Sequence, residues 1–222
     1  LEPISKLLLQ THPHNRIINI VTHGHSVPAG YFETPVVDTF NAYPHLMHHG
    51  LKSHSPNAII NVIVTGIGGE SSDSGAARFH KEVLTHRPDV ITIDYGLNDR
   101  MITLADARTS WIFMIEAALA KGIKVILLTP TLDTLSESMN PNDPLSLHAE
   151  QIRSLAIEYN VGLVDSFRLF NDYVKDGGSL NDLLSHINHP NRKGHELVAH
   201  ALLQWFPTMV SSRLGERSAI RH

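Results

Sequence analysis

The sequence predicts a single α/β domain built on a parallel sheet of five strands. Five short apolar runs alternate along the chain with longer segments of helical periodicity. The runs are apolar at successive positions, which is typical of strands covered by helices on both faces. Repeated strand–helix alternation implies right-handed crossovers and a doubly wound sheet. The predicted strands are residues 17–21, 58–64, 90–95, 124–128 and 161–164.

The segments between the strands predict helices. In the first of them, four large apolar side chains recur at nearly helical spacing: Phe40, Tyr43, Met47 and Leu51. Such a stripe forms one apolar face that can pack on the sheet. The predicted helices are residues 38–53, 74–85, 105–121, 146–160 and 194–205.

Length and composition restrict the class of protein. The 222 residues are enough for one sizeable core, and no linker or repeat divides them, so we expect one domain with residues 1–15 and 211–222 at its periphery. Eighteen basic and 22 acidic residues give a net charge of −4, which argues against a nucleic-acid partner. The apolar runs are too short for a membrane span. The absence of cysteine excludes disulfides and thiol chemistry within this chain.

The compartment and the oligomeric state are not readable from the sequence. The chain begins at Leu1, and no basic segment followed by an apolar signal core is visible. A soluble protein without cysteine is compatible with the cytoplasm, or with secretion after removal of a signal. We therefore leave the localisation open.

Four residues suited to acyl transfer follow different parts of the predicted sheet. Ser26 follows the first strand, Gly69 the second and Asn98 the third, and His189 precedes the last helix. Ligands of doubly wound sheets bind beyond the carboxyl ends of the strands, so we expect these residues at one edge. Ser26 is the candidate nucleophile and His189 its general base. The backbone N–H groups of Ser26 and Gly69 and the side-chain amide of Asn98 are candidate oxyanion donors.

At these motifs the chain resembles the SGNH hydrolases, also called GDSL-type esterases and lipases. Residues 24–26 read Gly-His-Ser where the family has Gly-Asp-Ser, and residues 66–72 resemble its second block. Residues 96–99 match Gly-x-Asn-Asp, and residues 189–191 read His-Pro-Asn. The resemblance covers roughly residues 17–205. It implies a flavodoxin-like three-layer α/β/α sandwich, a mechanism without metal or cofactor, and ester substrates.

Two histidines depart from the family pattern. His25 stands in place of the aspartate before the nucleophile, and His186 occupies the usual position of the triad aspartate, three residues before His189. An imidazole cannot supply the fixed negative charge that stabilises an imidazolium. We favour a Ser–His dyad supported by a backbone carbonyl. Asp182 folding back to His189 is the main alternative, and a more distant carboxylate such as Asp165 or Asp133 is another.

The sequence thus predicts a serine esterase acting on small acyl esters, foremost acetyl esters, with acetylated carbohydrates as the expected partners by family analogy. A second hypothesis is a metal-dependent hydrolase, because histidines gather in two segments. These histidines are His23, His25, His45, His48 and His49. A third is a catalytically weakened member of the fold that binds carbohydrate, since His186 replaces an acid.

Overall fold

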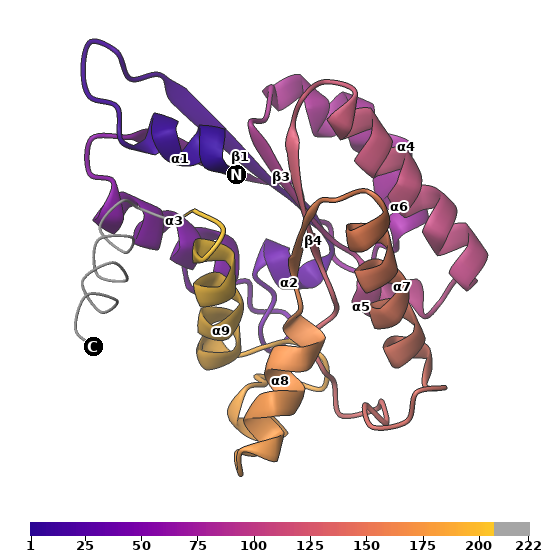
Figure 1. Ribbon diagram of the computed structural model, residues 1–222. Coiled ribbons are helices and arrows are strands. Elements are labelled where there is room, and N and C mark those ends of the chain that lie inside the picture. The colour runs from indigo at the N-terminus through magenta and orange to yellow at the C-terminus, as the bar shows by residue number, and fades with distance from the viewer. Residues whose placement is uncertain (207–222) are drawn as a thin grey trace, which may run out of the picture.

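The computed structural model describes residues 1–206 as one α/β domain (Figure 1). Its five strands all run parallel in the order β2-β1-β3-β4-β5. They are β1 (Ile17–Gly24), β2 (Ile59–Val64), β3 (Val90–Asp94), β4 (Lys124–Leu128) and β5 (Gly162–Val164). This is the flavodoxin-like strand order, so the predicted fold class is confirmed. The expected periphery at 211–222 lies outside the described residues.

Helices cover both faces of the sheet (Figure 1). One core cluster joins the sheet to α1, α3, α8 and α9, and a second joins it to α4 and α6, while α7 contributes to both. The helices are α1 (Glu2–Leu8), α3 (Tyr43–His54), α4 (Ser72–Glu82), α6 (Leu104–Leu119), α7 (Pro144–Glu158), α8 (Ser166–Lys175) and α9 (Arg192–Leu203). Short turns of helix, α2 (Ser26–Ala29) and α5 (Gly96–Asp99), follow β1 and β3 directly.

The first predicted helix starts later than its periodicity indicates. Residues Thr39–Asn41 form a separate 3₁₀ turn, and α3 begins at Tyr43. Pro44 lies in the first turn of α3, the one place where a helix tolerates proline without losing a hydrogen bond. A helix running from residue 38 would bury Pro44 in its interior. As a result Phe40 is 79% exposed and takes no part in the core.

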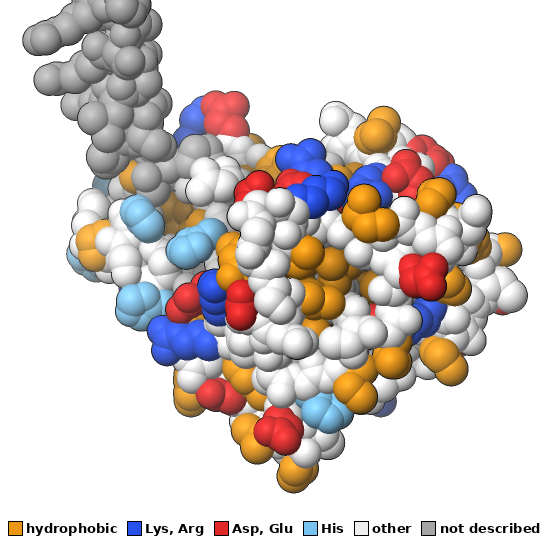
Figure 2. Space-filling model, turned by 90° about the horizontal axis from the view of Figure 1, so that it is seen from below, with side chains coloured by type: hydrophobic (Ala, Val, Ile, Leu, Met, Phe, Trp, Pro, Cys, Tyr) orange, Lys and Arg blue, Asp and Glu red, His pale blue; other side chains and the backbone are white. Residues whose placement is uncertain are grey.

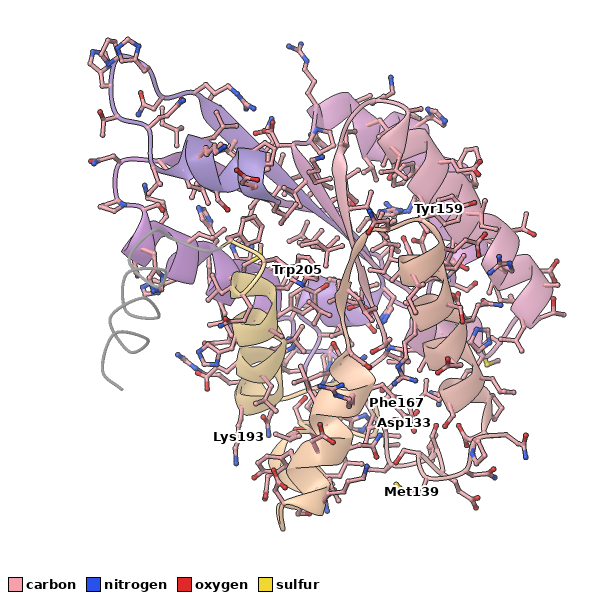
Figure 3. All side chains as sticks on the ribbon, viewed as in Figure 1. Asp133, Met139, Tyr159, Phe167, Lys193 and Trp205 are labelled. Atoms are coloured by element: carbon pink, nitrogen blue, oxygen red, sulfur yellow. The ribbon has the colours of Figure 1, made fainter. Side chains whose placement is uncertain are left out.

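Both ends of the described chain pack on the sheet. In α1, Ile4 and Leu8 belong to the buried core, although we expected residues 1–15 at the periphery. At the other end, Trp205 follows α9, and its indole N–H donates to the carbonyl oxygen of Leu163 in β5 at 3.2 Å (Figure 3). These contacts hold both ends of the described chain against the sheet. The loops that follow the strands lie at its carboxyl edge.

Candidate active site

The four candidate residues meet at the carboxyl edge of the sheet, as the topology requires. Together they line one open pocket of about 330 Å³. The other lining residues are Gly68, from the second sequence block, and Tyr31, Thr34 and Asn188, to which the sequence analysis gave no role. Figure 2 shows this end of the molecule from below, where hydrophobic side chains floor a central hollow and charged side chains lie around it. The pocket over Ser26 itself is lined mainly by polar and small residues.

Ser26 and His189 are in direct contact. Ser26 begins α2 immediately after β1, and its Oγ lies 3.0 Å from Nε2 of His189. The other ring nitrogen, Nδ1, lies 2.7 Å from the carbonyl oxygen of Phe32. A carbonyl can only accept, so Nδ1 carries the proton and Nε2 offers its lone pair to the serine hydroxyl. This is the tautomer that a general base needs.

The backbone carbonyl of Phe32 thus occupies the place expected for the missing acid. The carboxylate of Asp182 instead accepts from the Ser179 N–H and the Tyr173 hydroxyl. Asp165 is paired with Arg153 on α7, whose Nε donates to Oδ2 of Asp165 at 2.9 Å. No carboxylate within residues 1–206 forms a salt bridge with His189. The contacts of His189 are those that a carbonyl-supported dyad would need, with Nδ1 on the Phe32 carbonyl and Nε2 on Ser26.

Asp133, the remaining carboxylate considered, is used elsewhere. It bonds Arg100 and accepts from the backbone N–H groups of Leu135 and Ser136, which shapes the loop after β4. Figure 3 labels Asp133 and, further out on the segment between β4 and α7, Met139. His186 is exposed and does not take over the role of an acid.

The surroundings of His189 favour the neutral ring. Burial lowers the pKa of His189, and the nearby His25 and His186 lower it further, while the bond to Phe32 opposes them. The described partner of Nδ1 is a carbonyl, which offsets these effects with a partial and not a full negative charge. His189 therefore stays available as a base to lower pH than an ordinary histidine.

His25 acts as the cap of the short helix that begins with Ser26. Its Nδ1 accepts the Val27 N–H at 3.2 Å and lies 3.4 Å from Ser26 Oγ. With Nδ1 accepting, the proton is on Nε2, which faces Oδ1 of Asp94 at 3.5 Å. The other carboxylate oxygen of Asp94 accepts from the hydroxyl of Tyr43 at 3.2 Å. The imidazole thus provides the N-cap acceptor that an aspartate would provide.

The candidate oxyanion donors face the same pocket. Gly69 has φ +82°, a conformation that favours glycine and turns the local backbone. Within the described chain, the N–H groups of Ser26 and Gly69 have no hydrogen-bond acceptor. One amide hydrogen of Asn98 is donated to the carbonyl of Glu70 at 2.9 Å, which leaves the second hydrogen on Nδ2 for a ligand.

Asp99 anchors the turn that presents Asn98. It is fully buried, and its two oxygens accept from the Ser72 N–H at 2.7 Å and the Trp111 indole at 2.6 Å. These bonds tie α5 to α4 and α6. Burial raises the pKa of Asp99, and these two donors oppose that shift.

The histidines considered as metal ligands are dispersed. His23 is buried in β1 and contacts Thr65 Oγ1, the Gly75 carbonyl and the Tyr95 hydroxyl. His45 lies on α3, away from β1 in the chain, and stacks edge-on against Phe40. In the part of the chain that is described, no three His, Asp or Glu side chains converge as a metal site.

These features define a member of a known class. The model of the GDSL-like Lipase/Acylhydrolase family matches residues 22–197, and the chain belongs to that family. It is a carboxylic ester hydrolase of the serine type. Over residues 1–206, no helix is long and apolar enough to cross a membrane.

Individual relatives are similar over most of the chain. An acetylxylan esterase from Geobacillus stearothermophilus is 26% identical over 168 residues, which is 69% of this chain and 75% of that protein. The crystal structure of Axe2, an acetylxylan esterase from Geobacillus stearothermophilus, superposes with a TM-score of 0.73 at 20% identity, over 89% of this chain and 95% of that one. A two-domain esterase active on acetylated mannans superposes with a TM-score of 0.73 at 20% identity, over 92% of this chain and 51% of that one.

Proposed function

We propose that this chain releases acetate from acetylated carbohydrates, with Ser26 as nucleophile and His189 as its general base. The observation that carries the proposal is the 3.0 Å contact between Ser26 Oγ and His189 Nε2, with Nδ1 committed to the Phe32 carbonyl. This contact lies in one pocket with Gly69 and Asn98. This grouping supports the proposal, because acyl transfer needs a nucleophile, a base and oxyanion donors within reach of one ester group.

The proposed reaction runs through an acyl-serine. Ser26 Oγ attacks the ester carbonyl carbon while its proton passes to His189 Nε2. The N–H groups of Ser26 and Gly69 and the amide of Asn98 donate to the oxyanion. When the tetrahedral intermediate collapses, the C–O bond to the alcohol breaks and His189 returns the proton to the alcohol. Water then attacks the acyl-serine with His189 as base, which frees acetate and Ser26.

The substrate assignment rests on the pocket and on the relatives. The pocket offers no long apolar channel for an acyl chain among its lining residues, and Tyr31 is the only large ring beside that of His189 there. A small acyl group suits such a site. Two of the proteins that this chain resembles are an acetylxylan esterase and an esterase active on acetylated mannans. A sugar hydroxyl is accordingly the proposed leaving group.

The test compares the purified protein with Ser26→Ala on p-nitrophenyl acetate, p-nitrophenyl butyrate and acetylated xylo-oligosaccharides. Ser53→Ala is a matched control, because Ser53 is exposed on α3 and bonds only the His49 carbonyl among its described neighbours. We expect Ser26→Ala to lose at least ~1000-fold in kcat/KM and the control to keep full activity. The kcat/KM should be higher for p-nitrophenyl acetate than for p-nitrophenyl butyrate, and the wild-type protein should release acetate from the acetylated oligosaccharides.

A phosphonate ester that modifies reactive serines gives an independent measure. Intact mass should show one adduct on the wild-type protein and none on Ser26→Ala. Full hydrolysis by Ser26→Ala would overturn the proposed nucleophile. Binding of acetylated oligosaccharide without any release of acetate would overturn the proposed activity in favour of a binding protein.

A further inference from the structure

One guanidinium holds both ends of the loop that carries Gly69. Nη2 of Arg78, on α4, donates to the carbonyl of Thr65 at 2.6 Å and to Oε2 of Glu70 at 2.7 Å. Its Nε donates to the same carboxylate at 3.0 Å. The side chains of Arg78 and Glu70 are only 11% and 17% exposed, so solvent screens this pair weakly. The loop from residue 65 to 70 is thereby closed at its start and its end.

Two buried side chains complete this network from below. The hydroxyl of Tyr95 lies 3.2 Å from Nη2 of Arg78, 3.4 Å from the Glu70 carboxylate and 3.1 Å from Nε2 of His23. The other ring nitrogen of His23 contacts the Thr65 hydroxyl at 2.9 Å. Burial lowers the pKa of His23 to about 3. His23 is therefore neutral, and Arg78 is the cation that balances Glu70.

The backbone of Glu70 connects this network to two oxyanion donors. Gly69 immediately precedes it, so fixing Glu70 fixes the peptide next to the Gly69 N–H. The carbonyl oxygen of Glu70 accepts from Nδ2 of Asn98 at 2.9 Å. That bond selects the orientation of the amide in which the nitrogen, and not the oxygen, faces this side. Neither Glu70 nor Arg78 lines the pocket.

We propose that Glu70 and Arg78 are positioning residues that set the Gly69 N–H and the Asn98 amide for the oxyanion. This inference rests on the proposed function, because it needs an oxyanion to form at Ser26. Donors stabilise a transition state only when they are held within about 0.5 Å of the productive geometry. Loosening the Arg78–Glu70 pair should therefore weaken transition-state binding more than substrate binding.

The test uses Arg78→Lys, which keeps the charge but loses the fork, and Glu70→Gln, which keeps the shape but loses the charge. Arg108→Lys is a matched control, because Arg108 pairs with Glu158 at 2.6 Å between α6 and α7, where both side chains are exposed. For each variant we would measure kcat and KM for p-nitrophenyl acetate, the inhibition constant of methylboronic acid, and Tm. The boronate forms a tetrahedral adduct with the serine and so reports on the oxyanion donors.

We expect kcat to fall about 10- to 100-fold in Arg78→Lys and Glu70→Gln, with KM within threefold and boronate affinity reduced in parallel with kcat. Arg108→Lys should match the wild type. If Arg78→Lys does not fold, Glu70→Gln decides. Unchanged kcat and boronate affinity in a folded variant, or a loss of Tm alone, would overturn the inference.

A parallel assay of Ser26→Ala separates this inference from the proposed function. Activity of Ser26→Ala would overturn the proposed function, and the inference with it. An inactive Ser26→Ala beside a fully active Arg78→Lys would overturn the inference alone.

Discussion

The two sides of the pocket are built differently. On the side of the proposed oxyanion donors, a carboxylate with little exposure lies beside each candidate donor that follows β2 and β3. Asp99 bonds α4 and α6 from within the turn of Asn98, and Glu70 is clamped by Arg78 next to Gly69. The donors are thus fixed by charged hydrogen bonds in places that solvent hardly reaches.

On the side of His189, no carboxylate among residues 1–206 pairs with the imidazole. His189 lies on the segment between the 3₁₀ turn Leu180–Asp182 and α9, and its Nδ1 is held by the carbonyl of Phe32. Two contacts hold Phe32 in place. Its ring packs against that of His195, with the centroids 5.1 Å apart, and its backbone N–H donates to the Val36 carbonyl. A carbonyl fixes the tautomer but supplies only a partial charge to an imidazolium. In a Ser-His-Asp triad, one aspartate both orients the imidazole and stabilises the imidazolium. Here the Phe32 carbonyl provides the orientation without the full charge.

The largest expected effect comes from breaking the oxyanion side. Asn98→Ala removes the amide hydrogen that we propose for the developing oxyanion, together with the bond to the Glu70 carbonyl, so kcat should fall about 100- to 1000-fold with little change in KM. Steady-state kinetics on p-nitrophenyl acetate measures both constants. Asn181→Ala is a suitable control, because Asn181 is an exposed amide on a 3₁₀ turn away from the pocket lining. A change in KM alone would show that Asn98 binds the ground state.

A smaller effect, in the opposite direction, is expected from adding charge to the base side. The imidazole of His186 lowers the pKa of His189. His186→Asp puts a negative charge in its place, which should raise that pKa. The acid limb of kcat/KM, expected below pH 6.5 in the wild type because burial lowers this pKa, should move to higher pH. Above the limb, a stronger base should raise kcat by about threefold.

The control for this prediction is His186→Asn, which removes the ring without adding charge. It should move the limb less than His186→Asp does. Coinciding pH profiles for the two variants would contradict the electrostatic argument and would show that the loop holds position 186 too far from His189.

The fold was largely predictable because its strands are apolar on both faces and of ordinary length. The run at residues 124–128 coincides with β4. By contrast, α8 was not predicted, although Phe167 and Phe170 are buried at helical spacing and Asp165 caps its start. Its ten residues follow a strand of only three, and so short an alternation gives a weak periodic signal. The late start of α3 followed from Pro44, a single residue that outweighed an apolar stripe.

The site was predictable where chemistry is tied to residue type and not where the main chain acts. Ser26, Asn98 and His189 carry functional side chains within recognisable motifs, and they do share one pocket. Phe32 contributes only its carbonyl, which any residue possesses, so no sequence signal could single it out. Glu70 is similar, because its position before α4 is typical of residues that begin a helix, and its contact with Arg78 depends on the fold.

The smallest expected effect concerns His25, which lies between the two sides. His25→Asn keeps an acceptor for the Val27 N–H, whereas His25→Asp keeps the acceptor but places a second carboxylate beside buried Asp94. We expect Tm at pH 7 to be highest in the wild type, lower in His25→Asn and lowest in His25→Asp. The free energies of unfolding of the two variants should differ by about 1–2 kcal/mol. Like charges at this distance favour protonation of one carboxylate in the folded state. The deficit of His25→Asp is therefore present at neutral pH and shrinks as pH falls toward 5, which thermal unfolding at both pH values measures. A gap between the variants that stays constant with pH would show that Asp94 is not the group that senses position 25.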